Sequence, residues 1–469
     1  MERPKPVGDE AVVVFTTKLP ERYRVPEDQL VLPSSLSRYG LSEVVNRLLS
    51  FEKPVPMDFL IQGQFLRTSL QSYLEAHRLS SEQALNVEYI IALGEPEPTE
   101  ADQAPDWITG IASNSRANGG QFFSVVCCDG TLRLYQGTQS KLSTRISNQP
   151  LKCVASVEVD GGLGSHILAS GKDGLLRCLA LRHDGSTAPR AGPMTTLTPP
   201  TSGGATNEEP DSSNSLRTVE AVAFHEDGTL MGSAGWDNSV HIWNADAFQA
   251  VPEEAEAAGG KRKTTDRIDS AVPKFTLNGH SQVVTSLCFG SQARYPFTLM
   301  SSSWDCSVRV WDIAAADCVC NWTVGRAATS LSPSPLGSAR LATSHEDGHI
   351  SLWDLRAAPH SGVKGAFSLD ASTGLSLISA QTPHKRMASQ VAWCPTDEQR
   401  IASVGHDGLL CVLDVRSPKM PVQSLRLGTP FPMPTKVLCL AWLSADDIAV
   451  GGSDGKVLRI NLRREAAAE

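Results

Sequence analysis

The stretch that decides the fold reads GHSQVVTSLCF at residues 279–289 and, after a short interval, LMSSSWDCSVRVWD at residues 299–312. Runs of apolar and β-branched residues in both pieces are typical of short β-strands. Asp305 and Cys306 separate two of these runs and read as a turn. Trp311 follows the turn aspartate by six residues, and another aspartate follows it. The unit therefore reads as strand, turn and strand.

The same pattern recurs along the chain from residue 107 onward. Its turn aspartates are 42 to 68 residues apart. The short spacings match the ~40–45-residue WD repeat, and the long ones equal that period plus an insertion. Seven units of four short strands predict an all-β, seven-bladed WD40 propeller over residues 107–465, a closed ring with few open edges. The turn aspartates are Asp129, Asp173, Asp237, Asp305, Asp347, Asp407 and Asp454.

Two insertions interrupt the repeats, at about 183–215 and 247–274. Both are polar and contain glycine and proline, so we expect disordered surface loops there. Within the second, the basic triplet Lys261, Arg262 and Lys263 is a candidate nuclear import signal, although three charges in a loop are also common as plain solvated surface.

The last unit ends at Leu462, and no outer strand follows it. Either the last blade has three strands, or residues before Trp107 close the ring. The sequence leaves both possibilities open.

The first ninety residues follow another pattern, in which strand-like runs surround one amphipathic helix. The run AVVVFTT is β-branched, and a helical stripe with Ser42 as its cap follows a second short run. This order in so few residues predicts a small α+β domain of the β-grasp (ubiquitin-like) type at residues 1–93. Residues 94–106 are Pro-rich and acidic, which predicts a linker that lets the two domains move independently. The expected elements are strands at 11–17, 29–33, 59–66 (hinged at Gly63) and 84–91, and a helix at 41–49.

The stretch MDFLIQGQFLRTSLQSYLEAHRLSSEQALNVEYIIAL resembles the second half of ubiquitin. It is closer to the ubiquitin-like NLE domain that precedes WD repeats in two families of ribosome-biogenesis factor, Notchless and the WD-repeat subunit of the PeBoW complex. The phrase RYGLSEVVNRLLSFEKPVPMDFLIQGQFLRTSLQSYL is similar to the PeBoW subunit family in particular.

This resemblance implies an assembly factor for the large (60S) ribosomal subunit that acts in pre-rRNA processing in the nucleolus and nucleoplasm. It implies that the propeller docks to the block-of-proliferation protein, with Pescadillo in the same complex, on pre-60S particles. Trp236 and Trp304, which precede turn aspartates, are candidate contact residues, because indoles supply large contact areas. The alternative is that both indoles are buried between blades.

The resemblance also implies a role for Glu82, in the loop before the last strand of the ubiquitin-like domain. In the resembled factors a glutamate of this loop enters the metal-ion-dependent adhesion site (MIDAS) of midasin, a large AAA ATPase that pulls the factor off pre-ribosomes. A Mg²⁺ ion with one open coordination position accepts such a carboxylate. Mg²⁺ would then be shared with the partner, and this chain needs no cofactor or metal of its own. Glu75 and Glu88 are nearby controls.

The resemblance also places His280, Ser301, Asp305 and Trp311 in a hydrogen-bonded tetrad inside one blade. A set of Ser, His and Asp could also be read as a hydrolase site. Because the same turn aspartate recurs in every repeat, a structural role is the better interpretation, and we expect no enzyme activity. A second set, His384, Ser403 and Asp407, repeats most of the tetrad with Leu413 in place of the tryptophan.

Composition limits the remaining possibilities. The formal charge of −9 gives no electrostatic reason to expect nucleic acid as the main partner, although direct RNA contact stays open. The eleven cysteines lie mostly singly in apolar runs, which favours free buried thiols in a reducing compartment. No apolar run reaches membrane length, and we expect a soluble intracellular protein. Two rivals remain: a Notchless-like factor, whose family pattern has eight blades, and a WD-repeat substrate receptor of a ubiquitin ligase.

Overall fold

The computed structural model describes residues 10–51, 53–80, 83–94, 96–113, 122–159, 164–182, 190–197, 217–245, 267–269, 272–290, 297–335, 339–355, 376–417, 420–428 and 435–462. The chain divides into two compact units. Residues up to Glu95 make up most of the first, and Pro96–Asp414 with Pro418–Leu462 make up the second. Within the described ranges, no helix is both long and apolar enough to cross a membrane.

The first unit is a five-stranded mixed sheet with two α-helices, which confirms the predicted β-grasp domain. The strand order is β2-β1-β5-β3-β4. Strand β5 lies in the middle, parallel to β1 on one side and antiparallel to β3 on the other. The elements are β1 (Glu10–Thr16), a 3₁₀ turn (Glu21–Tyr23), β2 (Gln29–Pro33), α1 (Arg38–Leu49), β3 (Met57–Ile61), β4 (Gln64–Phe65), α2 (Leu70–His77) and β5 (Leu85–Ile91).

Aromatic side chains from the three central strands form the middle of this core. The rings of Phe15 and Tyr89 lie edge to face with centroids 6.1 Å apart, and Phe59 packs 6.0 Å from Phe15. The buried Tyr89 hydroxyl donates to the carbonyl of Tyr23 at 2.6 Å and accepts from the amide of Val25 at 2.9 Å. With its polar end satisfied, the phenol adds apolar burial without an unpaired group.

The helix begins earlier than the sequence indicates. Helix α1 starts at Arg38, after Ser37 at its N-cap position, so the prediction that Ser42 caps the helix was wrong. The Ser42 hydroxyl instead accepts a hydrogen bond from the amide of Met57 at 3.0 Å and ties the helix to the start of β3. In the sequence Ser42 has the position expected of a helix cap, but in the structure it lies within α1 and connects this helix to β3.

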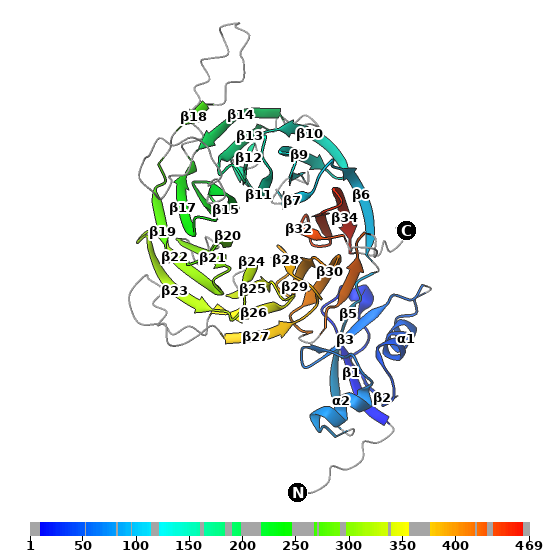
Figure 1. Cartoon of the computed structure of the whole chain (residues 1–469). Helices are drawn as coiled ribbons and strands as arrows, with labels where there is room; N and C mark the ends of the chain where they lie inside the picture. Colours follow the sequence, from blue (N-terminus) through cyan, green and yellow to red (C-terminus); the bar gives the residue numbers. More distant parts are fainter. Residues whose placement is uncertain are drawn as a thin grey trace. The chain divides into compact units, whose positions relative to one another are not determined.

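The second unit consists of seven sheets arranged around a central channel that their innermost strands line, which confirms the predicted seven-bladed propeller (Figure 1). Neighbouring strands within each sheet pair antiparallel, except for one short parallel strand at the edge of the second sheet. The eight blades of the Notchless pattern are not found among the described residues. The first four blades in chain order are β7 (Ile108–Ser113), β8 (Phe122–Cys127), β9 (Thr131–Gln136) and β10 (Gln139–Arg145); β11 (Leu151–Val159), β12 (Gly164–Gly171), β13 (Leu176–Arg182), β14 (Arg190–Leu197) and β18 (Arg267–Asp269); β15 (Val219–Phe224), β16 (Leu230–Gly235), β17 (Ser239–Asn244) and β19 (Phe275–Asn278); and β20 (Val284–Phe289), β21 (Thr298–Ser303), β22 (Ser307–Asp312) and β23 (Asp317–Thr323).

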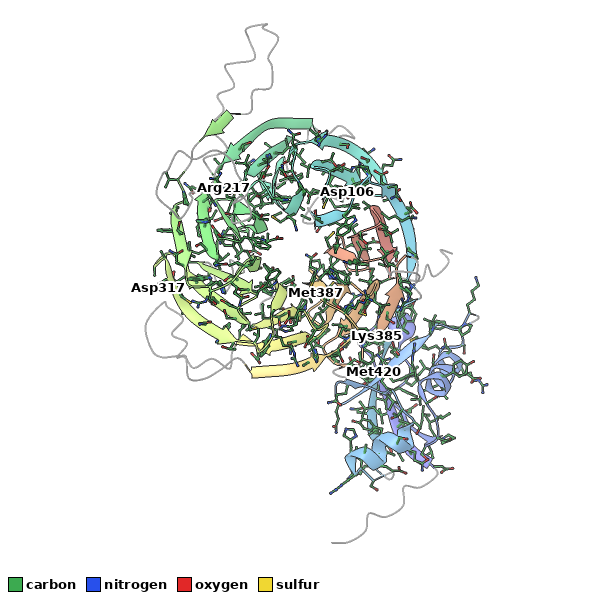
Figure 2. All side chains as sticks on the ribbon, in the orientation of Figure 1. Asp106, Arg217, Asp317, Lys385, Met387 and Met420 are labelled. Atoms are coloured by element: carbon green, nitrogen blue, oxygen red, sulfur yellow. The ribbon has the colours of Figure 1, made fainter. Side chains whose placement is uncertain are left out.

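The last three blades complete the ring. They are β24 (Ala328–Pro333), β25 (Arg340–His345), β26 (Ile350–Asp354) and β27 (Ser376–Gln381); β28 (Ala388–Trp393), β29 (Arg400–Gly405), β30 (Leu409–Asp414) and β31 (Gln423–Arg426); and β32 (Val437–Trp442), β33 (Asp447–Gly452), β34 (Lys456–Asn461) and β6 (Glu97–Gln103). Side chains fill the spaces between the blades, and Met387 lies at the inner edge of the ring while Asp317 lies at its outer edge (Figure 2).

The predicted linker at 94–106 needs a correction, because it contains β6. This strand pairs antiparallel with β34 and is the outer strand of the last blade, so residues before Trp107 close the ring. The sequence misled because an outer edge strand keeps polar and proline residues that are otherwise typical of linkers. Composition alone therefore does not distinguish an outer edge strand from a linker.

The insertions need a partial correction as well. The first, at 183–215, contains β14, which is the fourth strand of the second blade. The second, at 247–274, contains β18, which pairs in parallel with β14. The other described residues there, 272–274, lead into β19, and the remaining parts of both insertions, with Lys261, Arg262 and Lys263, lie outside the described residues.

Candidate functional site

The turn aspartates have one shared local task. In all seven blades a carboxylate oxygen of the aspartate accepts a hydrogen bond from the backbone N–H two residues later, at 2.9–3.2 Å. The residue between them always has a positive φ, from +61° to +87°. Aspartate closes such a turn well, and glycine fits the left-handed position without steric cost. The repeating Asp-Gly signature is therefore turn chemistry.

The tetrad residues of the fourth blade lie together as the resemblance implied. The indole N–H of Trp311 donates to the hydroxyl oxygen of Ser301 at 2.8 Å. Ser301 lies 2.7 Å from Nε2 of His280, and Nδ1 of His280 lies 2.9 Å from a carboxylate oxygen of Asp305. With the ionised carboxylate accepting from Nδ1–H, the serine hydroxyl donates to Nε2. The four groups form one directed chain from the indole to the carboxylate.

Burial and hydrogen bonding fix the charges in this chain. Burial lowers the pKa of His280, although Asp305 opposes the change, so the imidazole is neutral. Burial alone would raise the pKa of the Asp305 carboxyl, but hydrogen bonds from Ser307, His280 and Ser281 outweigh it and the pKa is lowered. A neutral histidine beside an ionised aspartate is the pairing that this geometry requires.

The same geometry argues against the hydrolase reading. The exposed fraction of Ser301 is 0%, and its oxygen already accepts from an indole and donates to His280. A nucleophilic serine must reach a substrate carbonyl, and a general base must be free to exchange a proton with it. These side chains join the blade's turn to its third strand, which is a structural task.

Other blades carry partial versions of the tetrad. In the sixth, His384 lies 2.9 Å from the hydroxyl of Ser403 and 3.1 Å from Asp407, but Leu413 provides no indole donor. In the fifth, the indole of Trp353 donates to Thr343, whose oxygen also lies 3.0 Å from Nε2 of His345. In the third, Trp243 donates to Ser233 at 2.9 Å.

The loop that carries Glu82 connects α2 to β5 in the first unit. Helix α2 ends at His77, and the next residue, Arg78, caps it with a φ of +55° and backbone hydrogen bonds to the carbonyls of Glu75 and Leu74. On one side Leu79 packs against the core, and on the other Leu85 is itself buried in it. Two leucines only six residues apart therefore fix both ends of the loop to a closed fold. Glu82 lies outside the described residues.

The two control glutamates are held in place by neighbours. Glu75 is exposed on α2, and its carboxylate accepts a hydrogen bond from the side-chain amide (Nε2) of Gln71 at 3.1 Å. Glu88 lies in β5 and forms an ion pair with Lys18 at 3.2 Å. Both carboxylates lie within ten residues of Glu82 in sequence, so they are suitable comparisons in a docking experiment.

The candidate contact residues Trp236 and Trp304 lie beside each other at one mouth of the channel. Their rings are edge to face with centroids 5.9 Å apart, and both line a cavity of about 570 Å³. Trp304 is 43% exposed, so the alternative of burial between blades is wrong for this residue, while Trp236 is half-buried. The indole of Trp236 donates to Glu220 at 2.8 Å, and Lys152 lies 3.6 Å from the same carboxylate.

A second group at this end of the ring was missed by sequence reasoning. Trp107 is 45% exposed, and the ammonium of Lys436 lies 5.7 Å from the centre of its ring. Burial, together with the charges of Lys436 and Arg386, lowers the pKa of nearby His406. Neither Lys436 nor Arg386 forms an ion pair with a carboxylate among the described side chains. The only signal in the sequence was the position of these residues before the first strands of their blades.

The described side chains hold no group of three or more His, Cys, Asp or Glu residues that could bind a metal ion. None of the eleven cysteines, all of which lie in the described ranges, takes part in a disulfide. Burial raises the pKa of several of them, including those of Cys127 to about 11 and Cys178 to about 12. Thiols with such pKa values are largely protonated at neutral pH and act as small apolar side chains.

Two family models match this chain. One, described as the NLE (NUC135) domain, matches residues 11–74. The other, described as the WD domain, G-beta repeat, matches residues 212–244 and 271–312. The first match lies in the β-grasp unit and the second covers strands of the third and fourth blades.

Several curated proteins are similar to the chain over nearly its whole length. A "Ribosome biogenesis protein WDR12 homolog" from Chlamydomonas reinhardtii is 32% identical over 95% of this chain and 96% of its own length. A protein of the same description from Oryza sativa subsp. japonica is 27% identical over 95% of each chain. A "Ribosome biogenesis protein YTM1" from Eremothecium gossypii is 28% identical over 95% of this chain and 96% of its own.

Proposed function

This chain belongs to the WDR12/YTM1 family of ribosome biogenesis proteins, and we propose that it is a non-enzymatic assembly factor for the large (60S) ribosomal subunit. A role in ribosome assembly follows from this membership. The finer proposal is that the chain acts in pre-rRNA processing and couples pre-60S particles to midasin, which removes it by pulling. Its place of action is the nucleolus and nucleoplasm, with Lys261, Arg262 and Lys263 as the candidate import signal.

The observation that carries the coupling proposal is the anchored loop between α2 and β5. A carboxylate that completes the coordination of a partner's Mg²⁺ must be presented with little loss of conformational entropy. Leu79 and Leu85 fix the ends of the loop in the core of a compact fold, which supports Glu82 as that carboxylate. The Mg²⁺ ion belongs to the MIDAS of midasin, and the load passes through its bond to Glu82.

The propeller supplies the second contact, with the block-of-proliferation protein, and Pescadillo joins the same complex. We define the channel-mouth surface as Trp107, Trp236, Trp304, Arg386 and Lys436. Two exposed indoles and two cations without carboxylate partners on one end of the ring are the composition of an interaction surface. This surface is our candidate for the contact with an acidic or apolar face of the partner propeller.

The proposal is tested in cells by replacing the gene with a Glu82→Ala version. The expected result is that the protein still enters pre-60S particles, because the propeller is unchanged, but stays on them and accumulates there. Glu75→Ala is the matched control, since it removes an exposed carboxylate from the same domain, and it should behave as wild type. Normal release of the Glu82→Ala protein would refute the role of this residue.

The remaining rival is a substrate receptor of a ubiquitin ligase, which also uses WD repeats. Purification of the wild-type protein under gentle conditions separates the two. Pre-ribosomal proteins in the purified fraction support the assembly-factor proposal, whereas a stoichiometric cullin scaffold in their place would contradict it.

A further inference from the structure

Strand β6 has an unusual position in the order of the chain. It is the outermost strand of the last blade, yet it comes first in the propeller's chain order. The last strand of the β-grasp domain, β5, ends at Ile91, and β6 begins at Glu97. Only residues 92–96 separate them, so the chain runs from one domain almost directly into the strand that closes the ring of the other.

The proposed docking residue stands at the beginning of the same path. Two residues separate Glu82 from the start of β5, so tension applied at Glu82 passes along the backbone of β5 and then through residues 92–96 into β6. No other covalent path joins the docking loop to the propeller. Any load that passes along the backbone from Glu82 therefore crosses these two strands in sequence.

The two strands differ in how firmly they are held. Strand β5 is central in its sheet and pairs with β1 on one side and β3 on the other. It also buries Leu85, Val87 and Tyr89 in the core. Strand β6 is an edge strand with a single paired neighbour, β34. When an edge strand separates from its sheet, the backbone hydrogen bonds to one neighbouring strand break. When a central strand separates, the hydrogen bonds to two neighbours break and core side chains become exposed as well.

The beginning of β6 is its weaker end. Pro98 has no backbone N–H to donate, and it lies opposite Ile460 in the ladder. Pro98, Thr99 and Glu100 are all exposed. The ion pair between Glu100 and Lys456 at 2.8 Å is exposed on both sides and adds little. The load from residues 92–96 enters at this end.

The far end of β6 is held by a latch that reaches into the first blade. Asp102 accepts hydrogen bonds from the hydroxyl of Tyr135 at 2.8 Å and from Arg133 at 3.1 Å, both on β9. Beyond it, the side chain of Gln103 donates to the carbonyl of Asp454 at 2.7 Å. Tyr135 is fully buried and the Arg133 side chain is 13% exposed, so both donors of this charged hydrogen-bond group are held inside the fold, while the Asp102 side chain is 33% exposed.

We infer that β6 is the element through which tension on the β-grasp domain opens the propeller ring. Tension peels β6 from β34, beginning at Glu97 and moving toward Asp102, where the latch to the first blade resists until it breaks. The first and last blades then part, and the surfaces that depend on a closed ring are lost together. This inference rests on the proposed function for the source of the tension, and it adds how pulling would weaken the propeller's grip on its partner.

The inference is tested on the full chain in an optical trap, without midasin. DNA handles are attached through azide-bearing residues introduced at position 82 and at position 317, which is exposed at the outer edge of the fourth blade (Figure 2). The wild-type chain should yield first by a step that frees residues 97–104, about 25 Å of backbone. Asp102→Asn should lower the force at which this step is completed, whereas Lys456→Gln should leave that force almost unchanged.

A reversible lock provides the decisive comparison. Thr99 and Arg459 lie directly opposite each other in the antiparallel ladder, a spacing that suits a disulfide. In the doubly substituted chain Thr99→Cys, Arg459→Cys, oxidation should remove the first step and reduction should restore it. An unchanged first step in the oxidised protein would overturn the inference, because another element would then yield first. Glu82 docking is not involved in this measurement, so failure of the docking proposal and failure of this one are distinguishable.

Discussion

Ser301 is the residue whose removal tests the tetrad most sharply. Its hydroxyl stands between two buried groups, the indole N–H of Trp311 and Nε2 of His280. In Ser301→Ala both lose their partner, because alanine can neither accept nor donate. The matched change is Ser403→Ala in the sixth blade, where Leu413 replaces the indole and only His384 loses a partner.

The structure sets the expected difference. Each buried polar group left without a partner costs about 1–3 kcal/mol. Ser301→Ala should therefore lower the free energy of unfolding by about 2–6 kcal/mol and Ser403→Ala by about 1–3 kcal/mol. Both serines have an exposed fraction of 0%, and both changes remove one oxygen atom, so packing losses are matched. The difference reports on the indole alone.

Urea titration followed by tryptophan fluorescence measures this difference in the propeller alone. The chain has nine tryptophans, and all of them lie at or after residue 107, outside the β-grasp domain. The fluorescence transition therefore reports unfolding of the ring without interference from the first domain. Equal losses for the two variants would contradict the idea that the indole–serine bond contributes to stability.

Three further predictions follow from individual residues. Burial lowers the pKa of His345 to about 4 from its ordinary 6.5, so the unfolded chain takes up a proton first as the pH falls. The free energy of unfolding should therefore decrease by up to about 3 kcal/mol between pH 6.5 and 4. His345→Gln should lack this pH-dependent decrease, as measured by urea titrations at the two pH values. Gly348→Ala should destabilise the propeller far more than Gly63→Ala destabilises the β-grasp domain. Both glycines have a positive φ, but a Cβ at Gly348 would lie 2.4 Å from a carbonyl oxygen, whereas a Cβ at Gly63 would have no atom within 4 Å. Equal shifts of the two thermal transitions would contradict this. Trp304→Ala should weaken binding of the block-of-proliferation propeller by tenfold or more, while Trp322→Phe, a change at a buried indole, should not alter the affinity measured by calorimetry.

The seven-bladed ring could be predicted from the sequence because the residues that mark each repeat form a turn whose hydrogen bonds are local in sequence. An aspartate that accepts from the N–H two residues on, followed by a residue with positive φ, is required in each blade whatever the rest of the blade contains. Such requirements depend on neighbours in sequence, so they can be seen without the fold. The same holds for the glycine turn at Gly63 in the β-grasp domain.

Features that depend on distant partners could not be predicted in this way. Strand β6 looks like a linker until β34, more than 350 residues later, provides the other side of its ladder. Asp102 looks like one more acidic linker residue until Tyr135 and Arg133 of another blade meet it. The missing outer strand of the last repeat was the one sign that a segment from elsewhere had to complete the ring.

The channel-mouth surface shows an intermediate case. Trp236 and Trp304 could be singled out because each precedes a turn aspartate, but their exposure could not be determined from position. The grouping of Lys436 with Trp107 depends on two blades that meet only where the ring closes. A surface assembled from several blades has no signature in any single repeat.

The measurement that tests the central claim most directly is the affinity of the purified full chain for the MIDAS domain of midasin, determined by calorimetry in the presence of Mg²⁺. The account predicts that Glu82→Ala reduces this affinity at least a hundredfold, that EDTA does the same to the wild-type chain, and that Glu75→Ala leaves it unchanged. Binding of the Glu82→Ala chain with wild-type affinity would show that tension cannot enter through this carboxylate.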